Sequence, residues 1–503
     1  MEKYILAHDL GTSGNKATLY DLNGNLVKSA TFSYGLITGE NNVAEQSADD
    51  WWRAVCESTR CLLEGIDSAS VAAVSFSGQM MGCLCVDSRG VPLRRALIWA
   101  DMRSAKQEAT VRRRIDELAF YKTTGHRISS SYSLTKLMWI KENEPEVYQS
   151  TYRMLNAKDY MIYKLTGRFV TEPSDASSTC LMDLNRLRWS DDLFDVSGLD
   201  KSKMPEIIPS VAIAGTVTRE ASALCGLLEG TPVVCGGGDG CCAAVGTGIV
   251  KEGVANCCLG TSSWISLATR APLYDEDMTT FNFAHIVPGY VMPCGTMQTG
   301  GGALSWAVDC LFEGFGMSKD RIYSLVNESV AKSPVGAKNL LFLPYLIGER
   351  SPRWNDSAKG TFVGLTLNHN RGDMLRSVME GVGYNLDVIL NTFRKNGSDI
   401  DRLILIGGGA RNAVWQQILS DIYSTPVSVP ECLEEATSMG AAITAGVGIG
   451  AFESFDVVDR FIRIREERKP DLSKGPRYAE MKKLFDEAYG ALYNFFESME
   501  RSC

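Results

Sequence analysis

Short apolar runs separated by glycine-rich turns predict alternating strands and helices along the chain. Runs at residues 4–7 and 17–20 have the length of strands and flank the tetrapeptide Leu-Gly-Thr-Ser at residues 10–13. The same tetrapeptide returns at residues 259–262, again between two apolar runs. Each copy predicts a hairpin whose backbone N–H groups and hydroxyls can surround phosphate oxygens. Two such hairpins almost half a chain apart indicate a duplicated domain that grips one polyphosphate from both sides.

The remaining periodicities extend this pattern through both halves of the chain. Further strands are expected at residues 71–76, 81–86, 231–235 and 402–406. Helices are expected at residues 49–63, 101–114, 133–142, 302–312, 373–394 and 478–497. Repeated β-β-β-α-β-α units with short links indicate mixed α/β layers and argue against a helical or an all-β fold.

The length of the chain predicts more than one domain. A chain of 503 residues exceeds one ordinary core and suggests two domains of about 200–250 residues each. We place the boundary so that the domains span residues 1–245 and 246–503. Hydrophobic residues make up 45% and charged residues 22% of the chain, which is ordinary for a globular enzyme.

Charge and cysteine spacing narrow the classes of partner. The chain has 51 basic and 60 acidic residues, a formal charge of −9, which argues against binding to nucleic acid or to an anionic membrane. The first apolar run is too short for a signal peptide, and no stretch of 18 apolar residues occurs. The fifteen cysteines lack the spacing of a zinc site and are expected to be small buried hydrophobes. These features predict a cytoplasmic protein in a reducing compartment.

The first hairpin carries a candidate metal ligand. Asp9 directly precedes the turn, where phosphate would repel a carboxylate unless a cation lay between them. We therefore interpret Asp9 as a ligand of Mg²⁺ or of a metal-bound water. Lys16, on the far side of the turn, could neutralise a bound phosphate. The alternative is that Asp9 only caps the turn and Lys16 is solvated.

Asp239 is the candidate general base. The strand expected at 231–235 runs into Gly-Gly-Gly-Asp-Gly at residues 236–240, so Asp239 projects from the carboxyl end of that strand. In a phosphoryl transfer to a hydroxyl, an aspartate placed there can accept the hydroxyl proton. The alternative is a glycine-rich turn that Asp239 caps.

A third glycine run, at residues 407–409, precedes Asn412 and could let adenine or ribose lie against bare backbone. Other common nucleotide and hydrolase motifs are missing from the sequence. It contains neither a P-loop, nor a Gly-x-Ser-x-Gly elbow, nor the HRD and DFG motifs of protein kinases.

Together these motifs resemble the FGGY family of carbohydrate kinases over essentially the whole chain. Residues 9–16 resemble the family's first phosphate loop, residues 260–262 its second, and residues 405–410 its adenosine loop. Thr-Gly-Gly-Gly-Ala-Leu-Ser-Trp at 299–306 resembles the glycine-rich signature that borders the nucleotide. Further matches, in the family's order, lie at residues 136–139, 158–160, 165–167, 343–345 and 348–352.

The resemblance implies a duplicated ribonuclease-H-like fold of the actin and hexokinase type, with ATP and sugar meeting in the cleft between the domains. It implies that Asp239 is the general base and that Asp9 helps to hold Mg²⁺. The ATP-binding residues it implies are Thr12, Ser13, Lys16, Thr261, Ser262, Gly301, Gly408, Gly409 and Asn412. The substrate-binding residues it implies are Gln79, Met80, Met81, Trp99, Asp101, Arg103 and Asp239.

Within the family the chain resembles xylulose kinases, which implies phosphorylation of D-xylulose to D-xylulose 5-phosphate. Their Gly-Gln-Met-His-Gly reads Gly-Gln-Met-Met-Gly at residues 78–82, so Met81 replaces a histidine that resembles a partner of a sugar hydroxyl. A thioether cannot donate the hydrogen bond that an imidazole can. Arg353 likewise stands where xylulose kinases usually have histidine.

Several functions remain open at this point. Another pentulose, a hexulose, a polyol or an aldonate could be the acceptor. A nucleotide switch of the actin or chaperone class would share the two hairpins, and a catalytically dead sugar sensor would lack Asp9 or Asp239. The expected partners are a small-molecule sugar and ATP. The sequence is compatible with a homodimer but does not determine the oligomeric state.

Overall fold

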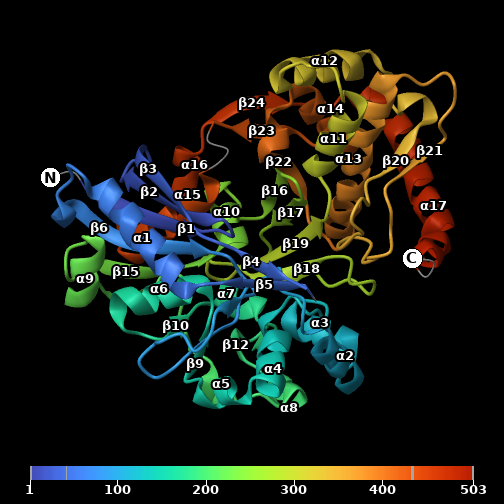
Figure 1. The fold of residues 1–503 in the computed structure, drawn as a ribbon. Coiled ribbons are helices and arrows are strands. Elements are labelled where there is room, and N and C mark those ends of the chain that lie inside the picture. Colours follow the sequence, from blue (N-terminus) through green and yellow to red (C-terminus); the bar gives the residue numbers. More distant parts are fainter. Residues whose placement is uncertain (1–2, 41, 432–434, 501–503) are drawn as a thin grey trace.

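Two mixed β-sheets, one from each half of the chain, organise the molecule (Figure 1). The computed structural model describes residues 3–40, 42–431 and 435–500. The first sheet has the order β14 (Ile213–Thr216), β15 (Pro232–Gly238), β6 (Val71–Gly78), β1 (Tyr4–Leu10), β2 (Gly14–Asp21), β3 (Leu26–Ser33). Strands β1, β2 and β3 form an antiparallel meander, while β6 and β15 run parallel to β1. Apolar side chains cover both faces, which places this sheet in the core.

The second sheet repeats this arrangement. Its order is β18 (Phe281–Ala284), β19 (Val291–Met297), β17 (Ser263–Leu267), β16 (Gly253–Leu259), β22 (Ile400–Ile406), β23 (Val427–Pro430), β24 (Ile464–Arg468). Strands β16, β17 and β19 form the meander, β22 and β23 run parallel to β16, and β24 is an antiparallel edge strand like β14. The shared strand order confirms the predicted duplicated α/β fold.

Helices of the first half cover its sheet, and several of them form an insertion between β6 and β15. Helix α1 (Ala48–Leu63) packs on β2 and β3 through Trp51, Val55 and Leu62, as its periodicity predicts. The other helices are α2 (Ala105–Arg114), α3 (Glu117–Thr124), α4 (Ser133–Asn143), α5 (Pro145–Ser150), α6 (Ala157–Thr166), α7 (Pro173–Ser178), α8 (Asp191–Ser197) and α9 (Arg219–Cys225). In Figure 1 the insertion, with α2, α4, α5 and α8, lies below the first sheet.

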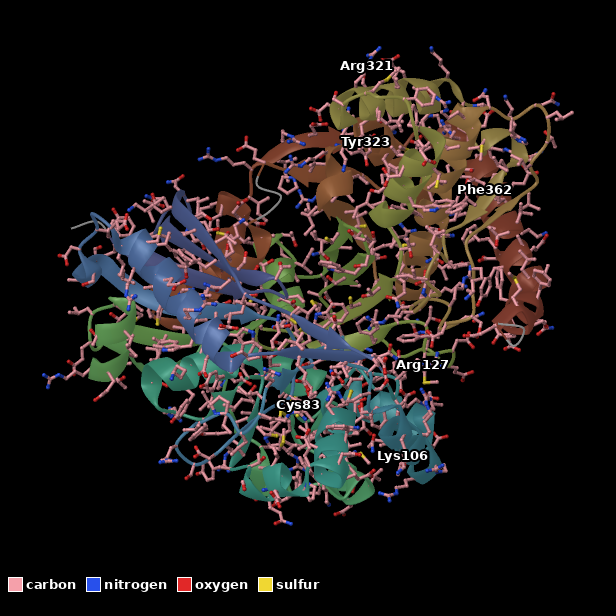
Figure 2. All side chains as sticks on the ribbon, viewed as in Figure 1. Cys83, Lys106, Arg127, Arg321, Tyr323 and Phe362 are labelled. Atoms are coloured by element: carbon pink, nitrogen blue, oxygen red, sulfur yellow. The ribbon has the colours of Figure 1, made fainter. Side chains whose placement is uncertain are left out.

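Short strands complete this half. They are β4 (Ile37–Gly39), β5 (Val43–Gln46), β7 (Leu84–Val86), β8 (Ala96–Leu97), β9 (Arg153–Leu155), β10 (Val170–Thr171), β11 (Met182–Asp183), β12 (Arg188–Trp189) and β13 (Glu206–Ile207). The strand expected at 81–86 is wrong in its first half, because Met81 adopts the left-handed φ of +63° and ends any extended run there. Cys83, labelled in Figure 2, lies buried in the insertion core.

Helices of the second half enclose a separate core. They are α11 (Gly301–Leu311), α12 (Lys319–Lys332), α13 (Arg371–Lys395), α14 (Ala413–Tyr423), α16 (Val458–Phe461) and α17 (Gly475–Glu500), with a small sheet of β20 (Leu341–Leu343) and β21 (Thr361–Val363). Helix α13 is buried over most of its length, so it forms the centre of this core. The helices expected at 302–312, 373–394 and 478–497 are all present.

Two helices rich in small residues join the halves. Helix α10 (Asp239–Gly246) follows β15, and α15 (Ala436–Gly448) follows β23. Although α15 comes from the last quarter of the chain, it packs on β1, β6 and β15 and crosses α10 (Figure 1). A Cβ atom on Gly246 would lie 1.8 Å from the Ala436 carbonyl oxygen, and one on Gly440 would lie 1.9 Å from that of Cys242. Only glycine permits this approach of the two backbones.

Thirteen cysteines lie in the described part of the chain, and all are free thiols. Ten of them are buried, as expected of small hydrophobes. Among the same residues there is no group of three or more His, Cys, Asp or Glu side chains arranged to hold a metal ion. None of the described helices combines the length and the apolar surface needed to span a bilayer.

Candidate active site

Asp239 is the first residue of α10, directly after the end of β15. The sequence suggested that the strand ends at residue 235, but it continues through Gly236, Gly237 and Gly238. These glycines are therefore strand residues, not a ligand-binding loop. Gly236 has a φ of +75°, and a Cβ on Gly238 would lie 2.6 Å from the Met80 side chain. Tight packing thus explains the glycine run and fixes where Asp239 emerges.

Asp9 and Asp239 face one cavity of about 300 Å³ between the two halves of the chain, which we call the carboxylate cavity. Met80, Met81, Trp99 and Tyr132 line it from the first half. From the second half the lining includes Ser262, Trp264, Phe281, Phe283, Met292, Thr296, Arg350 and Thr437. The walls are thus largely apolar and aromatic, with two carboxyl groups and one guanidinium among them. A site of this kind, partly open to solvent, can bind a small polyhydroxy compound between its walls.

Burial changes the acidity of both carboxyl groups. Desolvation raises the pKa of Asp239 to about 7, and the charge of Asp9 acts in the same direction, against one hydrogen bond from the Gly240 N–H. Desolvation also raises the pKa of Asp9 to about 6, opposed by a hydrogen bond that the Ser77 hydroxyl donates at 3.1 Å and by the charge of Lys16. Near neutral pH, Asp239 can therefore accept and release a proton, as a general base must.

The first hairpin lies against the second half of the chain. Asp9 and Lys16 are paired across β1 and β2, and the Lys16 ammonium forms a 3.0 Å ion pair with Glu435, just before α15. The Thr12 hydroxyl accepts a 2.9 Å hydrogen bond from the Trp99 indole, while Ser13 is exposed at the turn. Lys16 is thus partly buried and paired, contrary to the solvated alternative. Phosphate binding by these residues stays a prediction.

A second cavity, of about 610 Å³, lies in the second half of the chain. It collects five of the residues expected to bind ATP, namely Thr261, Gly301, Gly408, Gly409 and Asn412. Tyr323, labelled in Figure 2, also lines it. Ser262 faces the carboxylate cavity instead. The second hairpin therefore contributes Leu259, Gly260 and Thr261 to this cavity and Ser262 to the other, as expected of a loop that holds phosphates between nucleoside and acceptor.

The glycines of this cavity differ in what they accommodate. A Cβ on Gly301 would lie 2.6 Å from the Gly260 carbonyl oxygen, and one on Gly409 would lie 2.5 Å from Leu259 Cγ, so packing requires both glycines. A Cβ on Gly408 would meet no atom within 4 Å. The missing side chain at Gly408 therefore leaves space in the cavity rather than relieving a protein contact. This is the fit expected of a flat nucleoside lying on bare backbone.

Asn412 has a structural task that the sequence did not reveal. Its side-chain oxygen accepts hydrogen bonds from the N–H groups of Val414 and Trp415, which caps α14. Its amide nitrogen donates to Asn327 at 2.8 Å. A role of Asn412 in binding ATP stays a prediction.

Three of the residues expected to bind the sugar have partners away from the carboxylate cavity. Asp101 and Arg103 pair with each other at 2.7 Å, and Arg103 also pairs with Glu45 at 2.8 Å. The Gln79 amide donates to Gln46 at 2.7 Å. None of the three is among the described residues that line the cavity, and the charges of Asp101 and Arg103 are paired with each other and with Glu45 instead. Their expected contact with substrate stays a prediction.

Met81 does line the cavity, and its backbone is held on both sides. The Met81 N–H donates to the Ser178 hydroxyl at 3.1 Å, and its carbonyl accepts a 2.9 Å hydrogen bond from the buried ammonium of Lys136. These bonds support the left-handed φ of +63°, which a residue with a side chain rarely adopts. The side chain thus lies in the cavity wall beside Met80, not solely in the core.

The sequence reasoning missed Arg350, whose side chain lines the same cavity. Its backbone N–H donates to the buried Glu349 carboxylate at 2.9 Å. Glu349, whose pKa burial raises to about 8, also accepts from the Gln298 N–H and from Asn385. The available signal was the Gly-Glu-Arg-Ser-Pro run at 348–352. By contrast, Arg353 pairs with Asp486 on α17 and does not line this cavity.

Comparison with known proteins agrees with this geometry. The family model for the FGGY family of carbohydrate kinases, N-terminal domain, matches residues 4–246, and the C-terminal domain model matches residues 255–449. The chain is 32% identical to a xylulose kinase of Bacillus subtilis over 97% of both chains. It is 30% identical to a gluconokinase of Bacillus licheniformis over 98% of this chain and 97% of the relative. The crystal structure of xylulose kinase from Rhodospirillum rubrum superposes with a TM-score of 0.93 at 28% identity, covering 98% of this chain and all of that one.

The space at Gly408 generates a first prediction. We expect Gly408→Ala to weaken ATP binding by roughly 5–50-fold, because the methyl group occupies ligand space, and to leave the melting temperature unchanged. Gly409→Ala is the matched control, since its methyl group would press on Leu259 and lower stability instead. Titration calorimetry and thermal unfolding measure both effects. Unaltered ATP affinity in Gly408→Ala would show that the nucleoside does not lie there.

The raised pKa of Asp239 generates a second prediction, on stability. The folded state holds this proton more tightly than the unfolded chain, so the free energy of unfolding falls as pH rises from about 4 to about 7. Asp239→Asn removes that penalty and should be more stable than the wild type above pH 7, on the order of 1–4 kcal/mol in metal-free buffer. Below about pH 4 the difference should vanish. A melting-temperature difference that does not vary with pH would contradict the raised pKa.

Proposed function

Because the chain belongs to the FGGY family of carbohydrate kinases, we propose that it transfers the terminal phosphoryl group of ATP to a hydroxyl of a ketose, first of all D-xylulose. The product would be D-xylulose 5-phosphate. The observation that carries this proposal is the pair of part-buried carboxyl groups, Asp9 and Asp239, in a cavity that both halves of the chain line. A catalytically dead sugar sensor would have no need of an acid with a pKa raised to about 7.

Asp239 is the proposed general base. Its carboxylate, fixed by the 2.7 Å hydrogen bond from the Gly240 N–H, would accept the proton of the attacking hydroxyl. The aromatic side chains of Trp264, Phe281 and Phe283 would exclude water that could otherwise take the phosphoryl group. These side chains come from the second half, so the acceptor would be enclosed only where the two halves meet.

Asp9 is the proposed ligand of Mg²⁺. Its carboxylate is part-buried, and the hydrogen bond from Ser77 occupies one of its oxygens, which leaves capacity for a cation. A single protein carboxylate, completed by phosphate oxygens and waters, is a usual coordination of Mg²⁺ in phosphoryl-transfer sites. When bound, the ion would neutralise charge on the phosphates.

The two cavities would divide the nucleotide and the acceptor between them. Gly408 and Gly409 would border the nucleoside, while Thr261 on the second hairpin and Thr12, Ser13 and Lys16 on the first would surround the phosphates. Ser262 lies on the acceptor side of the same hairpin. Release of Lys16 from Glu435 would make its charge available to a phosphate, and this requires only a side-chain movement.

A second acceptor class, an aldonate, is favoured by one specific observation. The Arg350 guanidinium lines the carboxylate cavity, and a guanidinium is a strong partner for a carboxylate of a sugar acid. A gluconokinase is among the relatives at 30% identity. An aldonate carries a carboxylate and a ketose does not, so an assay of turnover with each acceptor separates the two proposals.

Turnover of the Asp239 variant tests the central proposal. We expect Asp239→Asn to lower kcat by roughly 10²–10⁴ with little change in ATP binding, because the hydroxyl proton loses its acceptor. ADP release, measured over pentuloses, hexuloses, polyols and aldonates, supplies the wild-type reference. Rapid ATP hydrolysis that no acceptor stimulates would instead indicate a nucleotide switch. Near-wild-type turnover in the variant would remove Asp239 from the mechanism.

Two variants of the cavity wall test the acceptor. Met81→His restores a hydrogen-bonding ring and should raise kcat/KM for D-xylulose by about 5–30-fold. Arg350→Gln keeps most of the side-chain length but removes the charge, so it should impair an aldonate far more than a ketose. The same acceptor panel measures both. An identical ranking of acceptors in Met81→His and the wild type would exclude Met81 from specificity.

A further inference from the structure

A buried hydrogen-bonded cluster behind β15 has no role in the proposed reaction, yet it contacts the residue next to Asp239. The Ser174 hydroxyl, on α7, accepts a 2.9 Å hydrogen bond from the Gly238 N–H. The same hydroxyl donates to the Glu172 carboxylate at 2.6 Å. Ser174 and Glu172 are wholly buried, so water cannot replace either partner.

The direction of these hydrogen bonds is determined by Glu172. Its carboxylate accepts from the backbone N–H of Ser174 at 2.9 Å and of Asp175 at 2.8 Å, and from the Ser210 hydroxyl at 2.7 Å. The ammonium of Lys158, also wholly buried, lies 3.5 Å from it. The Glu172 oxygens accept from all of these donors, and the Ser174 hydroxyl likewise donates to them. The Ser174 oxygen is then left to accept from Gly238, and the arrangement has one orientation.

The strand needs such an anchor at this point. Pairing of β15 with β6 shifts register between Val234 and Gly237, and Gly236 has a φ of +75°. Glycine backbone is the most adaptable, so the ladder alone would hold these residues loosely. Gly238 is also the cap residue of α10, whose first residue is Asp239. A displacement of Gly238 therefore moves the Asp239 carboxylate directly.

We propose that Ser174 is a positioning residue for Asp239, because its oriented hydroxyl fixes Gly238 and so sets where the carboxylate meets the acceptor hydroxyl. The inference rests on the proposed role of Asp239 as the base. Proton transfer is sensitive to sub-ångström placement of the base, whereas most of the residues proposed to bind ATP line the other cavity. Loss of Ser174 should therefore affect the chemical step and leave nucleotide binding intact.

Ser174→Ala tests this inference, with Ser177→Ala as the matched control. Ser177 lies on the same helix and is equally buried, but its hydroxyl donates to the Ser174 carbonyl at 2.7 Å and accepts from the Ala284 N–H at 3.2 Å. Both variants should lose stability. Only Ser174→Ala should lower kcat, by roughly 5–50-fold, with KM for ATP changed less than about twofold. An equal loss of kcat in Ser177→Ala would overturn the inference.

A double variant shows whether Ser174 acts through the base. In an Asp239→Asn background, Ser174→Ala should leave the residual turnover unchanged, because the group that it positions is already missing. A further loss of the same size would mean that Ser174 acts by another route, and this overturns the inference. Should Ser174→Ala fail to fold, Ser174→Cys replaces it, since a thiol is a weaker hydrogen-bonding group and should give a smaller loss of the same selective kind.

A readout without turnover separates this inference from the proposed function. The apparent pKa of Asp239 can be obtained from the pH dependence of the change in stability that Asp239→Asn causes. Measured in the Ser174→Ala background, that pKa should fall toward the ordinary value, since a loosened strand end admits water. Lack of turnover in the wild type with every acceptor would refute the proposed function alone. An unmoved Asp239 pKa in Ser174→Ala would refute the positioning role.

Discussion

The close crossing of α10 and α15 is the contact on which the site depends. Both helices are short and rich in small residues, and at Gly246 and Gly440 no Cβ atom fits between the backbones. The crossing brings a helix from the end of the chain onto the first sheet, next to β1, which carries Asp9, and against α10, which begins with Asp239. Thr437 of α15 consequently reaches the carboxylate cavity. A larger residue at the crossing would separate the two halves and open the cavity that they enclose.

Placement of two acids in this cavity lowers the stability of the fold near neutral pH, and we attribute that cost to the proposed phosphoryl transfer. Each carboxyl group is deprived of water, and the proximity of Asp9 adds to the cost of ionising Asp239. Elsewhere buried carboxyl groups are paired with bases, as Asp101 is with Arg103 at 2.7 Å and Asp373 is with Lys338 at 2.8 Å. Strained or uncompensated groups concentrate where a protein acts, because packing alone would have replaced them.

The structure gives several of the motif residues contacts that the sequence did not predict. Duplicated hairpins and helical periods were predictable, since both depend on local patterns of apolar residues and turns. The partners of Asp101 and Arg103 were not, because charged side chains at the right spacing for a ligand are equally suited to each other. Arg350 shows the reverse error, because the Gly-Glu-Arg-Ser-Pro run marked its segment but only the structure places it at the cavity.

Local patterns in the chain were sufficient to establish the duplicated α/β architecture, the family and the two acids, because repeats and ordered motifs can be recognised without knowledge of contacts. Long-range packing was needed to show that the glycines before Asp239 belong to a strand and that Met81 lies in the cavity wall. The same packing places Ser174 where it supports the strand end. These outcomes depend on which segments far apart in the chain lie side by side, and a one-dimensional pattern does not contain that information.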